Sequence, residues 1–435
     1  MSDRKKHLLS TPVFAILGRA GGIVIPFLVA YYFGAGPRSD AFFFAFALIF
    51  SLSGLFVPIF ESLLVPYLTE VKDSPGHVVS LAHGVLFLNL PLVLLLGLGI
   101  GLGLAPLLHR WSGLDAETAA LTARLFLIML PMLLFGVWAA CGNSILYAHK
   151  IFWFPAFAPF IRSVGAILLL VLGHQSLNID SVAIGFSIGE IVRWGCGLAL
   201  LVPLVGWKFH VNWKESWGKV KDFMSQAGYH LLGLLSLNLL PLVDQWFASW
   251  LGSGNLSLLS YADRLFQIPF QLLLTGFLQI FLSYWSEQYF RGSYKAFWEH
   301  VWKDVRVVFA LTFVLSLVLI LFRDLIARLL FGFGKMPAGD LPMLGSLFGW
   351  MMVGFAPAIL NLLYVRVLFV LKKSSVFFIQ SLIRLILNII FNFIFMRFWG
   401  LPGIAMSTSA VFIGTTIWLH YYLRRTCRQQ EEAAA

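Results

Sequence analysis

Twelve long apolar segments constrain this chain more than any other feature of its sequence. Each is about 20 residues long or longer, which is the length that an α-helix needs to cross about 30 Å of hydrocarbon. Backbone polar groups must be paired inside a bilayer, so such an array predicts a bundle of membrane-spanning helices. The predicted spans are Thr11–Phe33, Ala41–Leu68, Val79–Leu104, Leu121–Tyr147, Phe152–Leu172, Val182–Val205, Phe223–Leu251, Leu256–Trp285, Val305–Phe331, Leu341–Leu371, Ser375–Met396 and Leu401–Leu423.

The composition agrees with a membrane protein and excludes an ordinary soluble domain. Hydrophobic residues make up 59% of the chain and charged residues 12%, and the mean hydropathy is +0.85. The three cysteines, Cys141, Cys196 and Cys427, have no metal-ligand or redox spacing. We therefore expect no metal cluster and no cofactor.

The net charge of +11 is explained by membrane topology. With the N-terminus inside, most lysines and arginines of the connections fall on the cytoplasmic side, and the other side keeps only Arg38, Arg110, Lys335 and Arg397. An even number of spans then returns the C-terminus to the cytoplasm. We predict a multi-pass protein of a bacterial cytoplasmic membrane, with both termini cytoplasmic and no nucleic-acid partner. The first apolar stretch is of full length, so we expect no cleavable signal.

The chain divides into two halves. We predict a six-helix lobe at 1–206, a cytoplasmic amphipathic connection at 207–222 with three tryptophans and four lysines, and a second six-helix lobe at 223–435. At an offset of about 220 residues the halves show a faint parallel repeat. For example, Gly34-Ala35-Gly36 corresponds to Gly252-Ser253-Gly254. Several such matches together favour a duplication.

Three motifs resemble those of a known family, the lipid II flippases called MurJ or MviN. They are Phe33-Gly34-Ala35-Gly36-Pro37-Arg38-Ser39-Asp40-Ala41-Phe42-Phe43, Pro155-Ala156-Phe157-Ala158-Pro159, and Ser260-Tyr261-Ala262-Asp263-Arg264-Leu265 followed by Pro269. The resemblance implies an all-α polytopic membrane protein with about 12 transmembrane helices in two six-helix lobes around a central cavity. It also implies that this chain lacks two C-terminal helices of longer members.

The sequence departs from the family pattern at arginine positions. A second arginine is expected six positions after Arg19, where this chain has Ile25, and an arginine pair of the second helix is replaced by Ser53-Gly54. The resemblance still implies a lipid flippase, but these departures mean that it does not fix the identity of the lipid head group.

Arginines inside the predicted spans are the candidate substrate-binding residues. An ionised side chain at bilayer depth costs about 2.5 to 3.5 kcal/mol, so it usually faces a bundle interior or an aqueous cavity. Arg19 and Arg264 match arginine positions of the family, and Arg162 and Arg384 lie near the middle of equivalent spans. A guanidinium has a donor fork that matches phosphate oxygens. We predict that these residues bind a lipid pyrophosphate; the alternative is an interior ion pair or a side chain that extends to the interface.

Three acidic residues are candidate gate residues: Asp40, Glu61 and Asp263. Glu61 lies at a depth similar to that of Arg19, so an ion pair between them is one hypothesis. Asp263 precedes Arg264, but adjacent residues of a helix do not face each other, so Arg264 needs another partner.

A second group of polar residues lies toward the outer side of the second half. Asp244 falls in the seventh predicted span, Asn388 and Asn392 lie one turn apart in the eleventh, and Thr408 lies in the twelfth. Carboxylate, amide and hydroxyl oxygens suit a hard monovalent cation, so we predict coupling to Na⁺ or, through protonation of Asp244, to H⁺. The alternative is that the asparagines only form hydrogen bonds between helices.

These observations predict a flippase that moves a polyprenyl-pyrophosphate-linked saccharide, lipid II or a similar peptidoglycan precursor, from the inner to the outer leaflet by alternating access. The alternatives are a flippase for another lipid-linked polysaccharide repeat unit and a multidrug exporter of the same superfamily. An intramembrane enzyme is disfavoured because no nucleophile, acid–base pair or metal cluster is evident. The expected partners are the lipid substrate, the bilayer, and cell-wall or polysaccharide synthases.

Overall fold

The structure is a computed structural model that describes residues 3–71, 73–206, 217–225, 238–291, 294–371 and 373–434. These residues form helices and no strand. The first half contains α1 (Asp3–Phe33), α2 (Pro37–Ile59), the π-helix η1 (Phe60–Leu64), α3 (Val65–Val71), α4 (Pro75–Trp111), α5 (Ala116–Ala148), α6 (Trp153–Gly173) and α7 (Asp180–Val205). The second half contains α9 (Leu240–Ser249), α10 (Asn255–Arg291), α11 (Tyr294–Leu321), α12 (Arg323–Phe331), α13 (Asp340–Val353), α14 (Phe355–Val370), α15 (Ser374–Trp399) and α16 (Leu401–Ala434).

The predicted all-α polytopic membrane fold is confirmed. Among the described residues, ten helices are long and apolar enough to cross a membrane. The predicted seventh and eighth spans are not among these ten. The seventh includes residues 226–237, which lie outside the described part of the chain, and the eighth falls within α10. The number twelve therefore stays a prediction.

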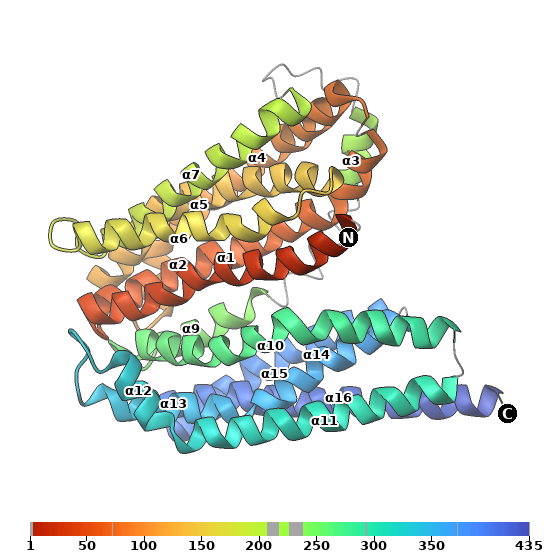
Figure 1. The fold of residues 1–435 in the computed structure, drawn as a ribbon. Coiled ribbons are helices and arrows are strands. Elements are labelled where there is room, and N and C mark those ends of the chain that lie inside the picture. The colour runs from red at the N-terminus through yellow and green to blue at the C-terminus, as the bar shows by residue number, and fades with distance from the viewer. Residues whose placement is uncertain are drawn as a thin grey trace. The chain divides into compact units, whose positions relative to one another are not determined.

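The chain forms two compact units, which Figure 1 shows as bundles of long helices. The first comprises Met1–Leu242 and the turn Gly252–Gly254, and the second comprises Val243–Leu251 and Asn255–Ala435. Of the predicted connection 207–222, residues 207–216 lie outside the described part, and 217–225 are helical. The lobe boundaries at 206 and 223 therefore stay predictions.

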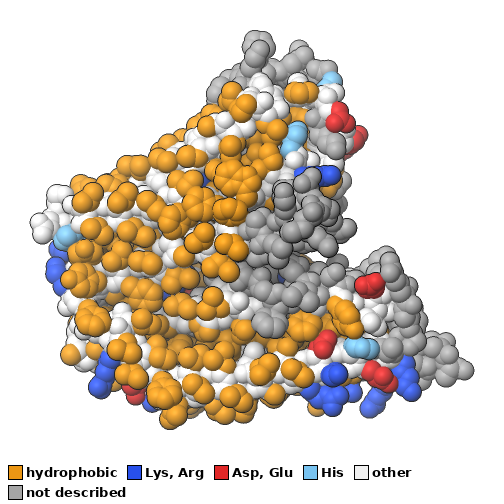
Figure 2. Space-filling model, in the orientation of Figure 1, with side chains coloured by type: hydrophobic (Ala, Val, Ile, Leu, Met, Phe, Trp, Pro, Cys, Tyr) orange, Lys and Arg blue, Asp and Glu red, His pale blue; other side chains and the backbone are white. Residues whose placement is uncertain are grey.

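Hydrophobic side chains cover the helices on the face shown in Figure 2, and the charged side chains gather at helix ends. In the first unit, α5 packs against α2, α4 and α7, and α6 packs against α1 and α7. The contact between α6 and α7 is a close one, because a Cβ atom on Gly189 would lie 2.4 Å from the carbonyl oxygen of Arg162. Gly185 and Gly189 form the small-xxx-small pattern that lets membrane helices approach closely.

Three of the predicted spans are interrupted. The second consists of α2, η1 and α3, and its π-helical turn follows Pro58. The ninth changes direction at Phe322, where α11 gives way to α12, and the tenth is divided at Gly354 between α13 and α14. Breaks of this kind are tolerated where neighbouring helices satisfy the freed backbone groups. For example, Ser409 Oγ accepts a hydrogen bond from the backbone N–H of Gly354 at 2.9 Å.

The two glycine turns of the repeat both begin with a glycine in the left-handed region, although Gly36 at the third position is extended, with φ 172°, where Gly254 is not. Gly34 has φ +69°, and Gly252 and Gly254 have φ +97° and +86°, a region that only glycine enters readily. Each turn leads into a long helix, α2 in the first half and α10 in the second. This likeness supports the duplication.

Candidate functional site

A buried charge cluster lies in the first unit between α6 and α7. Glu190 is fully buried, and it accepts hydrogen bonds from Nε and Nη2 of Arg193 one turn along α7. Its other oxygen lies 3.8 Å from Nη1 of Arg162 on α6. The spacing of Glu190 and Arg193 predicts their pairing, which is confirmed. Arg162, a candidate for substrate binding, thus lies beside the carboxylate of Glu190, which already pairs with Arg193.

The π-helix positions Glu61 toward α5. Asn143 Nδ2 donates a hydrogen bond to Glu61 Oε1 at 2.9 Å, and Ser144 Oγ donates to the carbonyl oxygen of Phe60 at 2.8 Å. A π-helical turn leaves carbonyl groups poorly paired and often occurs at functional sites. Two consecutive side chains of α5 therefore hold this turn and its carboxylate.

Arg19 is exposed on α1, and no partner is found for it among the described residues. Glu61 contacts Asn143 rather than Arg19. Arg19 is therefore a cation on a membrane-spanning helix, and none of the described carboxylates balances its charge.

Asp40 is buried in the first turn of α2. Its Oδ2 atom accepts a hydrogen bond from the backbone N–H of Gly254 at 2.5 Å. The Cβ that Gly254 lacks would lie 3.6 Å from the backbone of Ala35. The two glycine turns thus meet in the first unit, with the candidate gate residue Asp40 between them.

Two candidate arginines lie in the second unit. Arg264 on α10 has a buried Nε atom with no hydrogen-bond acceptor among the described residues, and the preceding Asp263 accepts a hydrogen bond from Gln267 Nε2 at 3.4 Å. The guanidinium of Arg384 on α15 lies 4.4 Å from the ring centre of Phe412 on α16. Cation–π stacking of this kind holds a guanidinium without neutralising it.

The structure brings together three members of the predicted cation site. Nδ2 of Asn388 and Nδ2 of Asn392 donate to Asp244 Oδ1 at 2.9 and 2.6 Å. Asn388 and Asn392 are buried, and the Oδ1 atom of Asn392 has no hydrogen-bond partner among the described residues. The hydroxyl of Thr408 instead donates to the carbonyl oxygen of Ile404 at 3.2 Å, within its own helix.

This set of oxygen atoms suits a monovalent cation. Carboxylate and amide oxygens are ligands of hard cations, and one carboxylate balances one positive charge. In the described part of the chain, no three His, Cys, Asp or Glu side chains are grouped to hold a metal ion.

Sequence reasoning missed the partners of the first unit. Nothing in the sequence shows that Asn143 faces Glu61. The proline at 58 was the one available signal of an irregular turn. Arg162 and Glu190 lie on different helices, so their proximity depends on packing that spacing does not reveal.

Comparison with known proteins gives one consistent result. The sequence profile of a family described as "Lipid II flippase MurJ" matches residues 29–434. The lipid II flippase MurJ of Burkholderia cenocepacia is 25% identical over 373 residues, which cover 82% of this chain and 71% of the relative. A probable lipid II flippase MurJ of Vibrio cholerae is 26% identical over 436 residues, which cover 93% and 80%.

Two solved structures share the fold. One is described as "Lipid II flippase MurJ, inward closed conformation"; its TM-score is 0.81 at 23% identity, over 96% of this chain and 87% of that one. The other is an inward-facing multidrug resistance transporter of the MATE family in the MOP superfamily, with a TM-score of 0.79 at 16% identity, over 98% and 99%. At these identities the likeness concerns the fold alone.

Proposed function

The chain belongs to the lipid II flippase MurJ family, and we propose on this basis that it moves lipid II, or a similar polyprenyl-pyrophosphate-linked saccharide, from the inner to the outer leaflet. It is a transporter and not an enzyme, as its relatives are named. The relatives establish the class, whereas the cargo and the transport cycle are our proposal.

The observation that carries the proposal is the exposed position of Arg19. A cation on a membrane-spanning helix is costly unless it faces an aqueous cavity or an anion. Arg19 has no carboxylate partner in the described part of the chain, and the buried Nε of Arg264 has no acceptor there. A pyrophosphate supplies both a negative charge and acceptor oxygens. We propose that Arg19 and Arg264 bind it, while Arg162 and Arg384 have supporting roles.

Alternating access fits the broken helices. The turns at Phe60–Leu64, Phe322 and Gly354 interrupt three predicted spans, so each is a point at which a helix can bend. We propose that bending there opens each side in turn, and that Asp40, Glu61 and Asp263 exchange partners during the cycle.

Ion coupling is assigned to Asp244 with Asn388 and Asn392. In the described arrangement, both amide groups turn their N–H donors toward the carboxylate. We propose that a sodium ion or a proton takes the place of these donors, and that rotation of the amides would present their oxygens to a metal ion.

The main test is translocation of a purified lipid-linked saccharide in liposomes. Arg19→Ala and Arg264→Ala should each abolish translocation without preventing membrane insertion, because a phosphate contact is lost together with a costly charge. Lysine at either position should rescue in part, since an ammonium lacks the bidentate fork. Arg110→Ala, at the end of α4, is the control. Full activity of both alanine variants would remove these arginines from the mechanism.

The cargo is tested by the same assay with other substrates. Movement of a different lipid-linked repeat unit but not of lipid II would favour a polysaccharide flippase. Failure with every polyprenyl-linked substrate, together with transport of an amphipathic cation, would favour a multidrug exporter.

The coupling site is tested by Asp244→Asn. We expect a changed response of transport to sodium, pH or membrane potential, because the single carboxylate of the group is neutralised. Asp340→Asn, at the first turn of α13, is a matched control for a carboxylate lost elsewhere in the same unit. An unchanged response of the Asp244 variant to all three conditions would contradict the assignment.

A further inference from the structure

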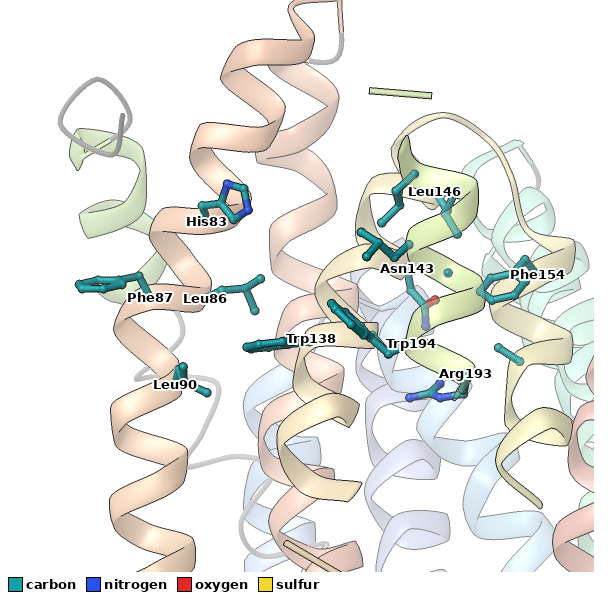
Figure 3. Close-up of a pocket in the computed structure, with 16 residues that line it drawn as sticks. His83, Leu86, Phe87, Leu90, Trp138, Asn143, Leu146, Phe154, Arg193 and Trp194 are labelled. Carbon is teal, nitrogen blue, oxygen red and sulfur yellow. The ribbon is translucent and has the colours of Figure 1, made fainter. Parts of the chain in front are cut away.

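A pocket opens on the first unit between α4 and α7, and neither Arg19 nor Arg264 lines it. α4 packs mainly on α5, and α7 packs on α6 and α5, whereas α4 and α7 contact each other only slightly, which leaves a cavity of about 200 Å³ over α5. Figure 3 shows Leu86 and Leu90 of α4 on one side, Trp194 of α7 on the other, and Trp138 of α5 between them. The two indole rings are 5.2 Å apart.

Two polar side chains of the pocket are paired within the protein, whereas Nε1 of Trp138 is buried without a hydrogen-bond partner among the described residues. Asn143 donates to Glu61, and Arg193 donates to Glu190. A third polar residue of the lining, His83, also interacts with another group of the protein. Two carboxylates, Glu61 and Glu190, thus lie next to the lining side chains Asn143 and Arg193, and Glu190 is also close to Arg162. A charged ligand would have to break these pairs, whereas an apolar chain would leave them intact.

The pocket lies near one face of the membrane. α6 has 21 residues, which correspond to about 31 Å and match the hydrocarbon thickness, so its first residues lie at a membrane boundary. Trp153 at its start is 41% exposed, as is common for an aromatic residue at an interface. Phe154 and Ala158, within about one turn of this boundary, line the pocket. It therefore extends from the side of the α5–α6 turn into the hydrocarbon.

The outer surfaces of α4 and α7 face hydrocarbon. Leu95, Leu98 and Leu102 of α4 are exposed, as are Ile188, Ile191 and Val192 of α7. A cavity that opens between two such surfaces is reached from the bilayer rather than from water. Phospholipids are the bulk component of the bilayer, so by mass action they fill even a weak site.

We propose that this pocket binds one acyl chain of a membrane phospholipid from the leaflet beside the α5–α6 turn. The chain lies against the rings of Trp138 and Trp194 and covers the paired side chains of Asn143 and Arg193. It thereby separates the charge cluster beneath from the bilayer. The proposal does not rest on the proposed function, because neither Arg19 nor Arg264 lines the pocket, although Glu61 and Arg162 lie in the cluster beneath it.

The test is photolabelling of the full-length protein in nanodiscs by a phosphatidylethanolamine with a diazirine midway along one acyl chain. Mass spectrometry should find labels on the peptides of the pocket lining, at 86–90, 138–146 and 194–201. Gly197→Leu should lower labelling roughly tenfold, because its side chain fills the pocket. A Cβ there would lie 3.3 Å from the ring of Phe154, which can turn away.

Gly195→Leu is the matched control, since it makes the same substitution two residues away on α7. A Cβ at Gly195 meets nothing within 4 Å, so labelling of the pocket should stay unchanged. Ala139→Leu fills the pocket from α5 and replaces Gly197→Leu if that variant does not fold. Equal labelling in the filled and control variants would overturn the proposal. Preferential labelling by a diazirine-bearing polyprenyl phosphate would overturn it too, because the occupant would then be the chain of a carrier lipid.

Discussion

At the residue scale, the same type of ion pair has two different roles in this protein. Glu190 is fully buried, and two arginines lie beside it, so its charge compensates theirs. Lys219 and Glu70 also form a pair, at 2.9 Å, but the side chain of Glu70 is 67% exposed. Solvent screening reduces the second interaction to about 0 to 1 kcal/mol.

We predict that Glu190→Gln destabilises the protein by about 3 to 5 kcal/mol, because it leaves buried guanidinium groups without a counter-charge. Glu70→Gln, the same substitution in the exposed pair, should change stability by less than about 1 kcal/mol. Thermal unfolding of both variants in the same detergent measures the difference. Equal midpoints would show that the cluster around Glu190 does not stabilise the fold.

The predictability of the sites also differs from residue to residue. Asn388 and Asn392 lie four apart on a regular helix, so their shared face and their depth relative to Asp244 could be derived from spacing, and all three are in contact. Thr408 was assigned by depth alone, and its hydroxyl bonds within its own helix. The direction of Glu61 could not be derived, because a π-helical turn changes the register of the side chains that follow it.

At the element scale, glycines determine how closely α6 and α7 approach. A Cβ on Gly165 would lie 2.6 Å from Cα of Gly189, and a Cβ on Gly185 would lie 2.7 Å from Cα of Ala166. The contact is therefore between backbones, as in other membrane helix pairs with small residues at the interface. This contact also places Arg162 of α6 next to Glu190 of α7.

We expect Gly189→Ala to destabilise the first unit by about 1 to 3 kcal/mol, since the added methyl group would overlap backbone atoms of Arg162. Gly195→Ala on the same helix meets no neighbour and should be neutral, or stabilising by up to about 1 kcal/mol through helix propensity. Unfolding midpoints of the two variants provide the comparison. A Gly189 variant as stable as the Gly195 variant would exclude a close backbone contact.

The breaks within helices were the least predictable feature of the elements. The ninth and tenth spans read as single apolar segments, yet each contains two helices. Hydropathy indicates whether a segment lies in hydrocarbon or in water, but not whether its helix is continuous. No proline lies at the break after Leu321. Gly354 and Pro357 lie at the second break, but glycine and proline are too common in membrane helices to identify one.

At the scale of the whole molecule, the two halves have similar helices and glycine turns but different polar contacts. Asn143 of the first half contacts a carboxylate, whereas Asn361 of the second contacts the neutral side chains of Thr415 and Gln380. The repeat thus allows the class of fold and the glycine turns to be predicted. It does not predict the partners, because they come from helices whose sequences have diverged.

The charge distribution leads to a final prediction about orientation. Lysine and arginine favour the side of the membrane from which they cannot readily be translocated, so Lys150 and Lys219 should be cytoplasmic, while Arg110 and Lys335 should be outside. In a variant with its three cysteines replaced by alanine, a cysteine at 110 or 335 should react with a membrane-impermeant maleimide added to intact cells. A cysteine at 150 or 219 should react only after permeabilisation. The positions form two matched pairs, 110 with 150 and 335 with 219. In each pair one position is predicted to be outside and the other cytoplasmic. Labelling of 150 and 219 from outside would reverse the orientation, and it would also reverse the direction in which the proposed transport moves its cargo.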